Sequence, residues 1–113
     1  MSGHRINPKE VTDIMVAKKF TSLMSSAASR DIEFNLKLTT VKKLLKTTNC
    51  YFTGVPMNLI QNDPNMRSID RLDNELGYVE GNVVACCARV NQIKGGLTLL
   101  EIKNIYEGIK HLL

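Results

Sequence analysis

The chain has 113 residues, of which 43% are hydrophobic and 23% are charged, so it is long and apolar enough to bury one core. This composition excludes an intrinsically disordered chain and a collagen-like repeat. Lysine and arginine number 15 against 11 acidic residues, and the positive excess lies in residues 1–50. A basic half either attracts a polyanion such as nucleic acid or forms an ordinary solvated face.

The sequence shows no targeting or membrane signal. The first residues lack the apolar stretch of a secretory leader, and no apolar run approaches the ~20 residues that cross a bilayer. We therefore expect a soluble, cytoplasmic protein with no membrane partner and with its three cysteines reduced. Two histidines, His4 and His111, stand near opposite ends, and both are expected to be ordinary surface residues.

Two helices are expected in the first half of the chain. The first covers residues 8–29, because Pro8 suits a first helical turn and apolar residues recur at helical spacing behind it. A short extended segment follows at 32–37, where polar and apolar residues alternate. The second helix runs from a cap at Thr39 or Thr40 to about residue 46.

The middle of the chain predicts two strands and a short helix. Residues 49–66 have the composition of a loop. Strand-like residues follow at 67–71 and 83–86, separated by a turn-rich connection. A short helix over 87–94 ends at two glycines, Gly95-Gly96.

A last helix is expected after Thr98, which has capping-box spacing to Glu101. Apolar residues form one stripe along this helix: Ile102, Ile105, Tyr106, Ile109, Leu112 and Leu113. Together these elements predict an α+β fold.

Three polar residues in the middle of the chain suggest a compact site. Asp70 stands near the end of the first strand, Asn82 just before the second, and Asn91 on the short helix. Folding strand, turn, strand and helix together brings Asp70 and Asn91 close, where a carboxylate and an amide oxygen can share a hard cation. Asn82 is placed to tie down the loop between the strands. The alternative is that all three are ordinary turn and cap residues.

The wider pattern around these residues resembles the HNH (His-Me finger, ββα-metal) endonuclease family, and most of all its small bacteriophage versions. The resemblance covers roughly residues 27–113. The matching motifs are spaced in the family's order and lie at residues 50–57, 68–74, 77–78, 81–84 and 90–95.

The resemblance implies a ββα-metal finger flanked by helices. On this basis residues 1–48 form a basic helical region that packs on the finger, 49–96 form the finger core, and 97–113 form the C-terminal helix, within a single compact domain.

The resemblance also implies a function. The chain is expected to be a metal-dependent endonuclease that hydrolyses phosphodiester bonds of DNA, encoded by a phage and acting in the host cytoplasm. Asp70 and Asn91 would hold one Mg²⁺ or Mn²⁺ ion, and Asn82 would orient the loop. Basic side chains are expected to contact DNA phosphates: Arg67, Arg89, Lys94, Lys42, Lys43 and Lys46. For the three lysines of the second helix, a solvated face is the open alternative.

One departure from the family concerns the general base. The signature histidine follows the acidic ligand directly, and here that position is Arg71. A guanidinium stays protonated, so Arg71 cannot take a proton from water and would instead clamp a phosphate. Asp73 and water activated by the metal remain open as substitutes. By strand alternation Arg67 and Arg71 share one side, with Asp70 on the other.

A second departure concerns zinc. Many family members join two Cys-x-x-Cys pairs through a structural zinc, but here Thr53 and Val90 replace two of the four cysteines. We therefore expect no structural zinc. Cys50 and Cys87 should lie close together as small apolar groups, and Cys86 should face the core.

The missing histidine keeps a second function open. The same scaffold could bind DNA without cutting it, or bind and inhibit a host protein. In that case Phe20, Leu23 and Met24 of the first helix would form the surface for a host protein or for a second copy of the chain.

Overall fold

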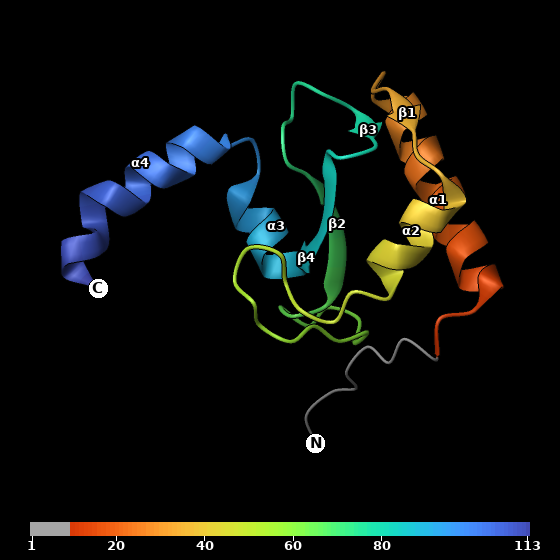
Figure 1. The fold of residues 1–113 in the computed structure, drawn as a ribbon, viewed down its shortest axis with the longest axis horizontal. Coiled ribbons are helices and arrows are strands. Elements are labelled where there is room, and N and C mark those ends of the chain that lie inside the picture. The colour runs from red at the N-terminus through yellow and green to blue at the C-terminus, as the bar shows by residue number, and fades with distance from the viewer. Residues whose placement is uncertain (1–9) are drawn as a thin grey trace.

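The computed structural model describes residues 10–113 as an α+β arrangement of helices and two small sheets (Figure 1). Helix α1 spans Asp13–Ser29 and α2 spans Leu38–Leu45. The helix expected from residue 8 begins later, because the side chain of Thr12 caps it by accepting the Met15 N–H at 3.2 Å. The expected start at Pro8 lies outside the described residues.

Within residues 10–113, four strands form two separate pairs. Strand β2 (Arg67–Arg71) pairs antiparallel with β4 (Val83–Cys87), as the two strand-like segments predicted. Strands β1 (Phe34–Asn35) and β3 (Tyr78–Val79) form a short parallel pair that the sequence did not predict. This pair depends on a contact between distant segments, which no local pattern encodes.

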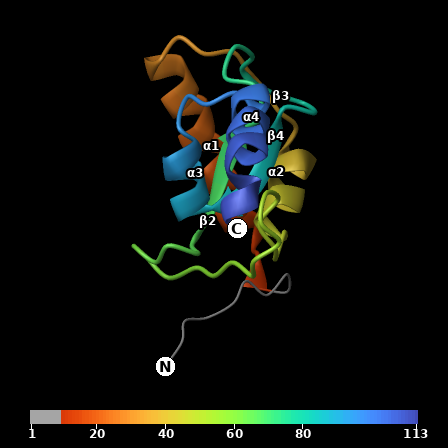
Figure 2. The same ribbon diagram turned by 90° about the vertical axis from the view of Figure 1, so that its left-hand side faces the viewer.

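Helix α3 (Ala88–Lys94) follows β4 without a loop and ends at Gly95, whose φ of +46° suits glycine. Figures 1 and 2 place α3 on one side of the β2–β4 hairpin and α2 on the other. The hairpin therefore stands between α3 and the pair of helices α1 and α2. Strand β2 is positioned to present side chains in both directions.

The core lies between α1, α2 and the hairpin. Its buried side chains include Val16, Leu23, Ala27, Val41, Leu45, Met57, Ile69 and Cys86. Phe20 packs edge-on against Phe34 with ring centroids 5.1 Å apart. The expected partner surface on α1 is therefore corrected: Leu23 is buried and Phe20 packs on the core, so Met24 alone of the three is exposed.

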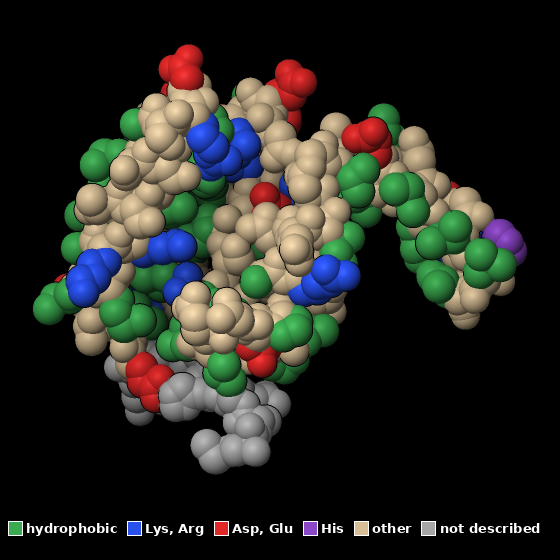
Figure 3. Space-filling model, turned by 180° about the vertical axis from the view of Figure 1, so that it is seen from behind, with side chains coloured by type: hydrophobic (Ala, Val, Ile, Leu, Met, Phe, Trp, Pro, Cys, Tyr) green, Lys and Arg blue, Asp and Glu red, His purple; other side chains and the backbone are tan. Residues whose placement is uncertain are grey.

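Helix α4 (Leu99–Ile109) and the 3₁₀ turn η2 (Lys110–Leu112) project away from this body (Figure 1). The capping box at its start is confirmed, since Thr98 and Glu101 exchange side chain-to-backbone hydrogen bonds of 2.9 and 3.0 Å. No residue of α4 is buried, and apolar side chains show along the arm in Figure 3. Within residues 10–113, no helix is long and apolar enough to cross a membrane.

The three cysteines pack as the sequence predicted. The backbone N–H of Cys87 donates to Cys50 Sγ at 3.4 Å, and Cys86 is fully buried on β4. Burial raises the pKa of Cys86 to about 12 and that of Cys87 to about 11. Both groups are therefore neutral thiols within the core at physiological pH.

These thiols predict a loss of stability in alkali. Unfolded thiols ionise from about pH 9, whereas the buried ones stay protonated to higher pH, so rising pH favours the unfolded chain. Between pH 9 and 11 each thiol should lower the free energy of unfolding by about 1.4 kcal/mol per pH unit. Urea unfolding at pH 8, 9.5 and 10.5 measures this slope. The slope should be shallower in Cys86→Ala; an unchanged slope would contradict the assignment.

Gly77 predicts a second stability effect. A Cβ atom added there would collide with the carbonyl oxygen of Glu33 and lie 2.7 Å from Glu33 Cβ. The same carbonyl accepts the N–H of Tyr78 at 2.8 Å, so it cannot move without breaking the β1–β3 pair. Gly77→Ala should therefore lower the free energy of unfolding by about 2–3 kcal/mol in urea. Gly108→Ala on exposed α4 is the matched control, and it should be neutral or slightly stabilising. Equal effects would exclude the close approach as the cause.

Candidate active site

The candidate site lies where α3 crosses β2. Ser68 and Asp70 are two residues apart on β2 and both face α3. Asn91 Nδ2 donates to Ser68 Oγ at 2.7 Å, and Lys94 Nζ lies 3.1 Å from Asp70 Oδ2. Two side chains about one helical turn apart on α3 therefore contact two side chains that are two residues apart on β2. The structure brings Asp70 and Asn91 to the same side of β2.

Asp70 and Lys94 form a buried ion pair. Asp70 is 8% exposed and Lys94 is 4% exposed. Lys94 Nζ also donates to the backbone oxygen of Arg71 at 3.0 Å. Asp70 Oδ2 makes no hydrogen bond in spite of its burial: the 3.1 Å contact with Lys94 Nζ is short enough for one, but its angles do not suit one. The ammonium therefore supplies counter-charge to the carboxylate but leaves this oxygen unsatisfied. The expectation that Lys94 contacts DNA from the surface is corrected, because it is buried against Asp70.

Arg71 faces away from this pair. Its Nη1 donates to the carbonyl oxygens of Asn74 at 3.0 Å and Leu76 at 2.9 Å, and its guanidinium lies 5.5 Å from the ring centroid of Tyr78. These contacts hold the loop between β2 and β3. The expectation that Arg71 clamps a phosphate is therefore corrected, because its guanidinium binds carbonyl oxygens of the loop.

Asn82 ties down the same loop, as its place before β4 predicted. It is 6% exposed, its Oδ1 accepts the N–H of Asp73 at 2.9 Å, and its Nδ2 donates to the carbonyls of Asp73 and Gly77. Asp73, one open substitute for the base, turns its Oδ1 to the N–H of Glu75 at 2.9 Å. Both side chains are therefore engaged in shaping the loop.

The other expected DNA-contacting residues lie on different faces. Arg89 Nη1 on α3 donates to Gln92 Oε1 at 3.1 Å, while Lys42 Nζ on α2 lies 3.7 Å from Asp13 Oδ1. Lys43 on α2 and Lys46 just after this helix are exposed, and α2 lies on the far side of the hairpin from α3 (Figure 2). The structure does not bring these four side chains to one surface. His111 is exposed on η2, and His4 lies outside the described residues.

Arg67 and Lys19 form a feature that the sequence analysis did not identify. Arg67 points to the α1 side of β2. Burial lowers the pKa of Lys19, and the positive charge of Arg67 lowers it further. A signal was present, since Lys19 is three residues after Val16 and four before Leu23, which places it on the buried face of α1.

Comparisons with known proteins give viral relatives. No family model and no solved structure matches the chain. The chain is 31% identical over 88 residues to an uncharacterized 29.0 kDa protein of Enterobacteria phage T4, a match that covers 77% of this chain and 35% of the phage protein. It is 30% identical over 90 residues to an uncharacterized protein of Acanthamoeba polyphaga mimivirus, covering 74% of this chain and 16% of that protein. The chain thus spans about a third or less of these curated relatives.

The Asp70–Lys94 pair predicts a specific pattern of stabilities. Lys94→Met leaves a buried carboxylate without its counter-charge and should cost about 3–5 kcal/mol in urea unfolding. Asp70→Asn alone should also be costly, because it leaves the ammonium unpaired. The double variant should recover most of the loss, since neither charge then remains buried. Additive losses would show that the two side chains do not depend on each other.

Proposed function

We propose that the chain is an HNH-type DNA endonuclease that hydrolyses phosphodiester bonds with one divalent metal ion. The observation that carries the proposal is the contact of α3 with β2, which brings Asp70 and Asn91 to one side of the hairpin. Two antiparallel strands followed directly by a helix, in this order and with these residues, are what the HNH resemblance implies. A viral origin of the relatives agrees with the phage versions of that family.

The oxygen donors at this contact suit Mg²⁺ or Mn²⁺ in chemical type. Asp70 Oδ2 is buried without a hydrogen bond, and Asn91 uses its Nδ2 on Ser68, which leaves its Oδ1 as an acceptor. Within residues 10–113 no three His, Cys, Asp or Glu side chains gather at one point, so Asp70 and Asn91 would hold the ion together with water. The bound ion would supply Lewis-acid stabilisation of charge on the scissile phosphate.

Lys94 opposes metal binding at the same carboxylate. Its ammonium lies 3.1 Å from Asp70 Oδ2, and a divalent ion there would be repelled unless the lysine turned away. Arg71 cannot act as a base, and its contacts with the loop hold it away from the site. General-base catalysis contributes typically 10²–10⁴-fold. The proposed enzyme is therefore slow compared with one that has a base.

A second candidate function is a scaffold that binds DNA without cutting it or inhibits a host protein. The observation that favours it is the same ion pair: Lys94 already gives Asp70 a positive partner from within the chain. A chain of this kind has no use for a divalent ion. It would bind DNA equally well with and without metal.

Nicking of supercoiled plasmid separates the two functions. The endonuclease should convert the plasmid to open circles with Mg²⁺ or Mn²⁺ and not with EDTA. Asp70→Ala and Asn91→Ala should each reduce the rate about 100-fold or more, because each removes a metal ligand worth several kcal/mol of transition-state stabilisation. Asn104→Ala on exposed α4 is the matched control and should cut normally.

Metal-independent nicking would contradict the endonuclease proposal. So would the absence of nicking by a protein that a cooperative unfolding transition shows to be folded. Retarded DNA migration in EDTA with no nicking in Mn²⁺ would favour the DNA-binding scaffold instead. Nicking that persists unchanged in Asp70→Ala would also contradict the proposal, because the carboxylate would then not be needed for cleavage.

A further inference from the structure

Arg67 is half-buried, and the described residues leave its charge uncompensated. Its Nε and Nη1 are buried and have no hydrogen-bond partner. A guanidinium presents five N–H donors and stays protonated at any physiological pH. Burying such donors without acceptors destabilises the folded chain. Such a group is stabilised when a ligand from outside the chain accepts its hydrogen bonds. A ligand that carries a negative charge suits it best.

Lys19 adds a second positive charge at the same place. Burial lowers the pKa of Lys19, and the charge of Arg67 lowers it further. No carboxylate acts on either group, and among residues 10–113 neither forms a salt bridge. Two positively charged, half-buried side chains thus act on each other on this side of the hairpin. Electrostatics alone would separate them.

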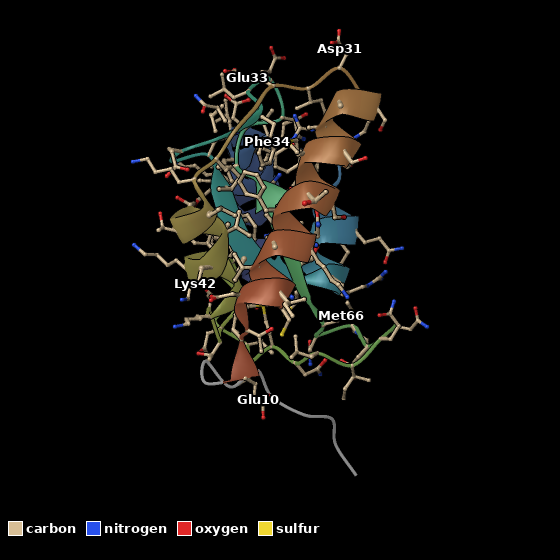
Figure 4. All side chains as sticks on the ribbon, turned by 90° about the vertical axis from the view of Figure 1, so that its right-hand side faces the viewer. Glu10, Asp31, Glu33, Phe34, Lys42 and Met66 are labelled. Atoms are coloured by element: carbon tan, nitrogen blue, oxygen red, sulfur yellow. The ribbon has the colours of Figure 1, made fainter. Side chains whose placement is uncertain are left out.

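The fold holds these two residues together from opposite elements. Lys19 stands on the face of α1 that carries Val16 and Leu23, both buried in the core. Arg67 begins β2 and points to this side of the hairpin, while Ser68 points to α3. Figure 4 views the molecule from the α1 side and labels Met66, the residue before Arg67, just ahead of β2.

We propose that Lys19 and Arg67 together bind one oxyanion between α1 and β2, and that this oxyanion is a backbone phosphate of a nucleic acid. The planar fork of Arg67 suits two oxygens of one phosphate, and the lysine adds a point charge beside it. The nucleic acid as the source of the phosphate rests on the proposed function, but the binding of an oxyanion does not. Helix α1 then forms one wall of the nucleic-acid-binding surface.

Inorganic phosphate probes the oxyanion site by itself. Thermal unfolding is followed with increasing phosphate against chloride at equal ionic strength. The wild-type midpoint should rise and then saturate, because phosphate binds the folded chain. Arg67→Met and Lys19→Met should lose this saturable rise, whereas Lys18→Met, which removes the exposed neighbouring lysine of α1, should keep it. In chloride, Arg67→Met should be at least as stable as the wild type, since it removes a half-buried charge whose buried N–H groups have no partner.

DNA binding in EDTA tests the source of the phosphate. Fluorescence anisotropy of a short duplex at several salt concentrations gives the slope of log affinity against log salt. Arg67→Met and Lys19→Met should each weaken binding and make the slope shallower by about 1, as expected for one lost phosphate contact. Lys18→Met should leave the slope close to that of the wild type. Arg67→Lys, which keeps the charge but not the fork, should lose affinity with a smaller change of slope.

Two results would overturn the proposal. If the Arg67 and Lys19 variants respond to phosphate as Lys18→Met does, the pair binds no oxyanion. If they lose the phosphate effect but bind DNA normally, the site takes a small phosphate and the nucleic-acid assignment is wrong. Both assays run without divalent metal, so a failure of plasmid nicking leaves their outcome intact. If the chain binds DNA through these residues but does not nick it, the oxyanion site is supported and the endonuclease function is wrong.

Discussion

The contact between Asp70 and Lys94 constrains the rest of the candidate site. A carboxylate that is 8% exposed requires a positive partner, and Lys94 provides it across the β2–α3 contact. The same ammonium donates to the backbone of Arg71 and so joins α3 to the end of β2. Asn91 reinforces the contact one helical turn earlier through Ser68. Any ligand of Asp70 must therefore compete with an interaction that also holds α3 in place.

The two sides of β2 differ in how their charges are compensated. On the α3 side, the negative charge of Asp70 is balanced from within the chain by Lys94. On the α1 side, Arg67 and Lys19 have no acidic partner among the described residues. The first arrangement favours stability, while the second leaves a place for an anion from outside. A surface that binds a polyanion benefits from this imbalance, because the phosphate group restores the missing charge.

The sequence predicted features that depend on near neighbours. The capping box follows from the spacing of Thr98 and Glu101, while the β2–β4 hairpin and the loop held by Asn82 follow from strand and turn patterns within residues 67–87. It did not predict that Lys94 is buried, that Arg71 turns to the loop or that the charge of Arg67 acts on Lys19. These three depend on how α1, α3 and the loop pack around β2, and the charge of a residue alone does not reveal its partner.

The central claim is that the Asp70 carboxylate takes one cation at a time, either the Lys94 ammonium or a divalent metal ion. Titration of Mn²⁺ followed by the electron paramagnetic resonance signal of the free ion measures this directly. The account predicts that Lys94→Met binds one Mn²⁺ at least about 10-fold more tightly than the wild type, because the competing charge is gone. It also predicts that the added substitution Asp70→Asn abolishes this binding. Equal Mn²⁺ affinity in the wild type and Lys94→Met would contradict the account.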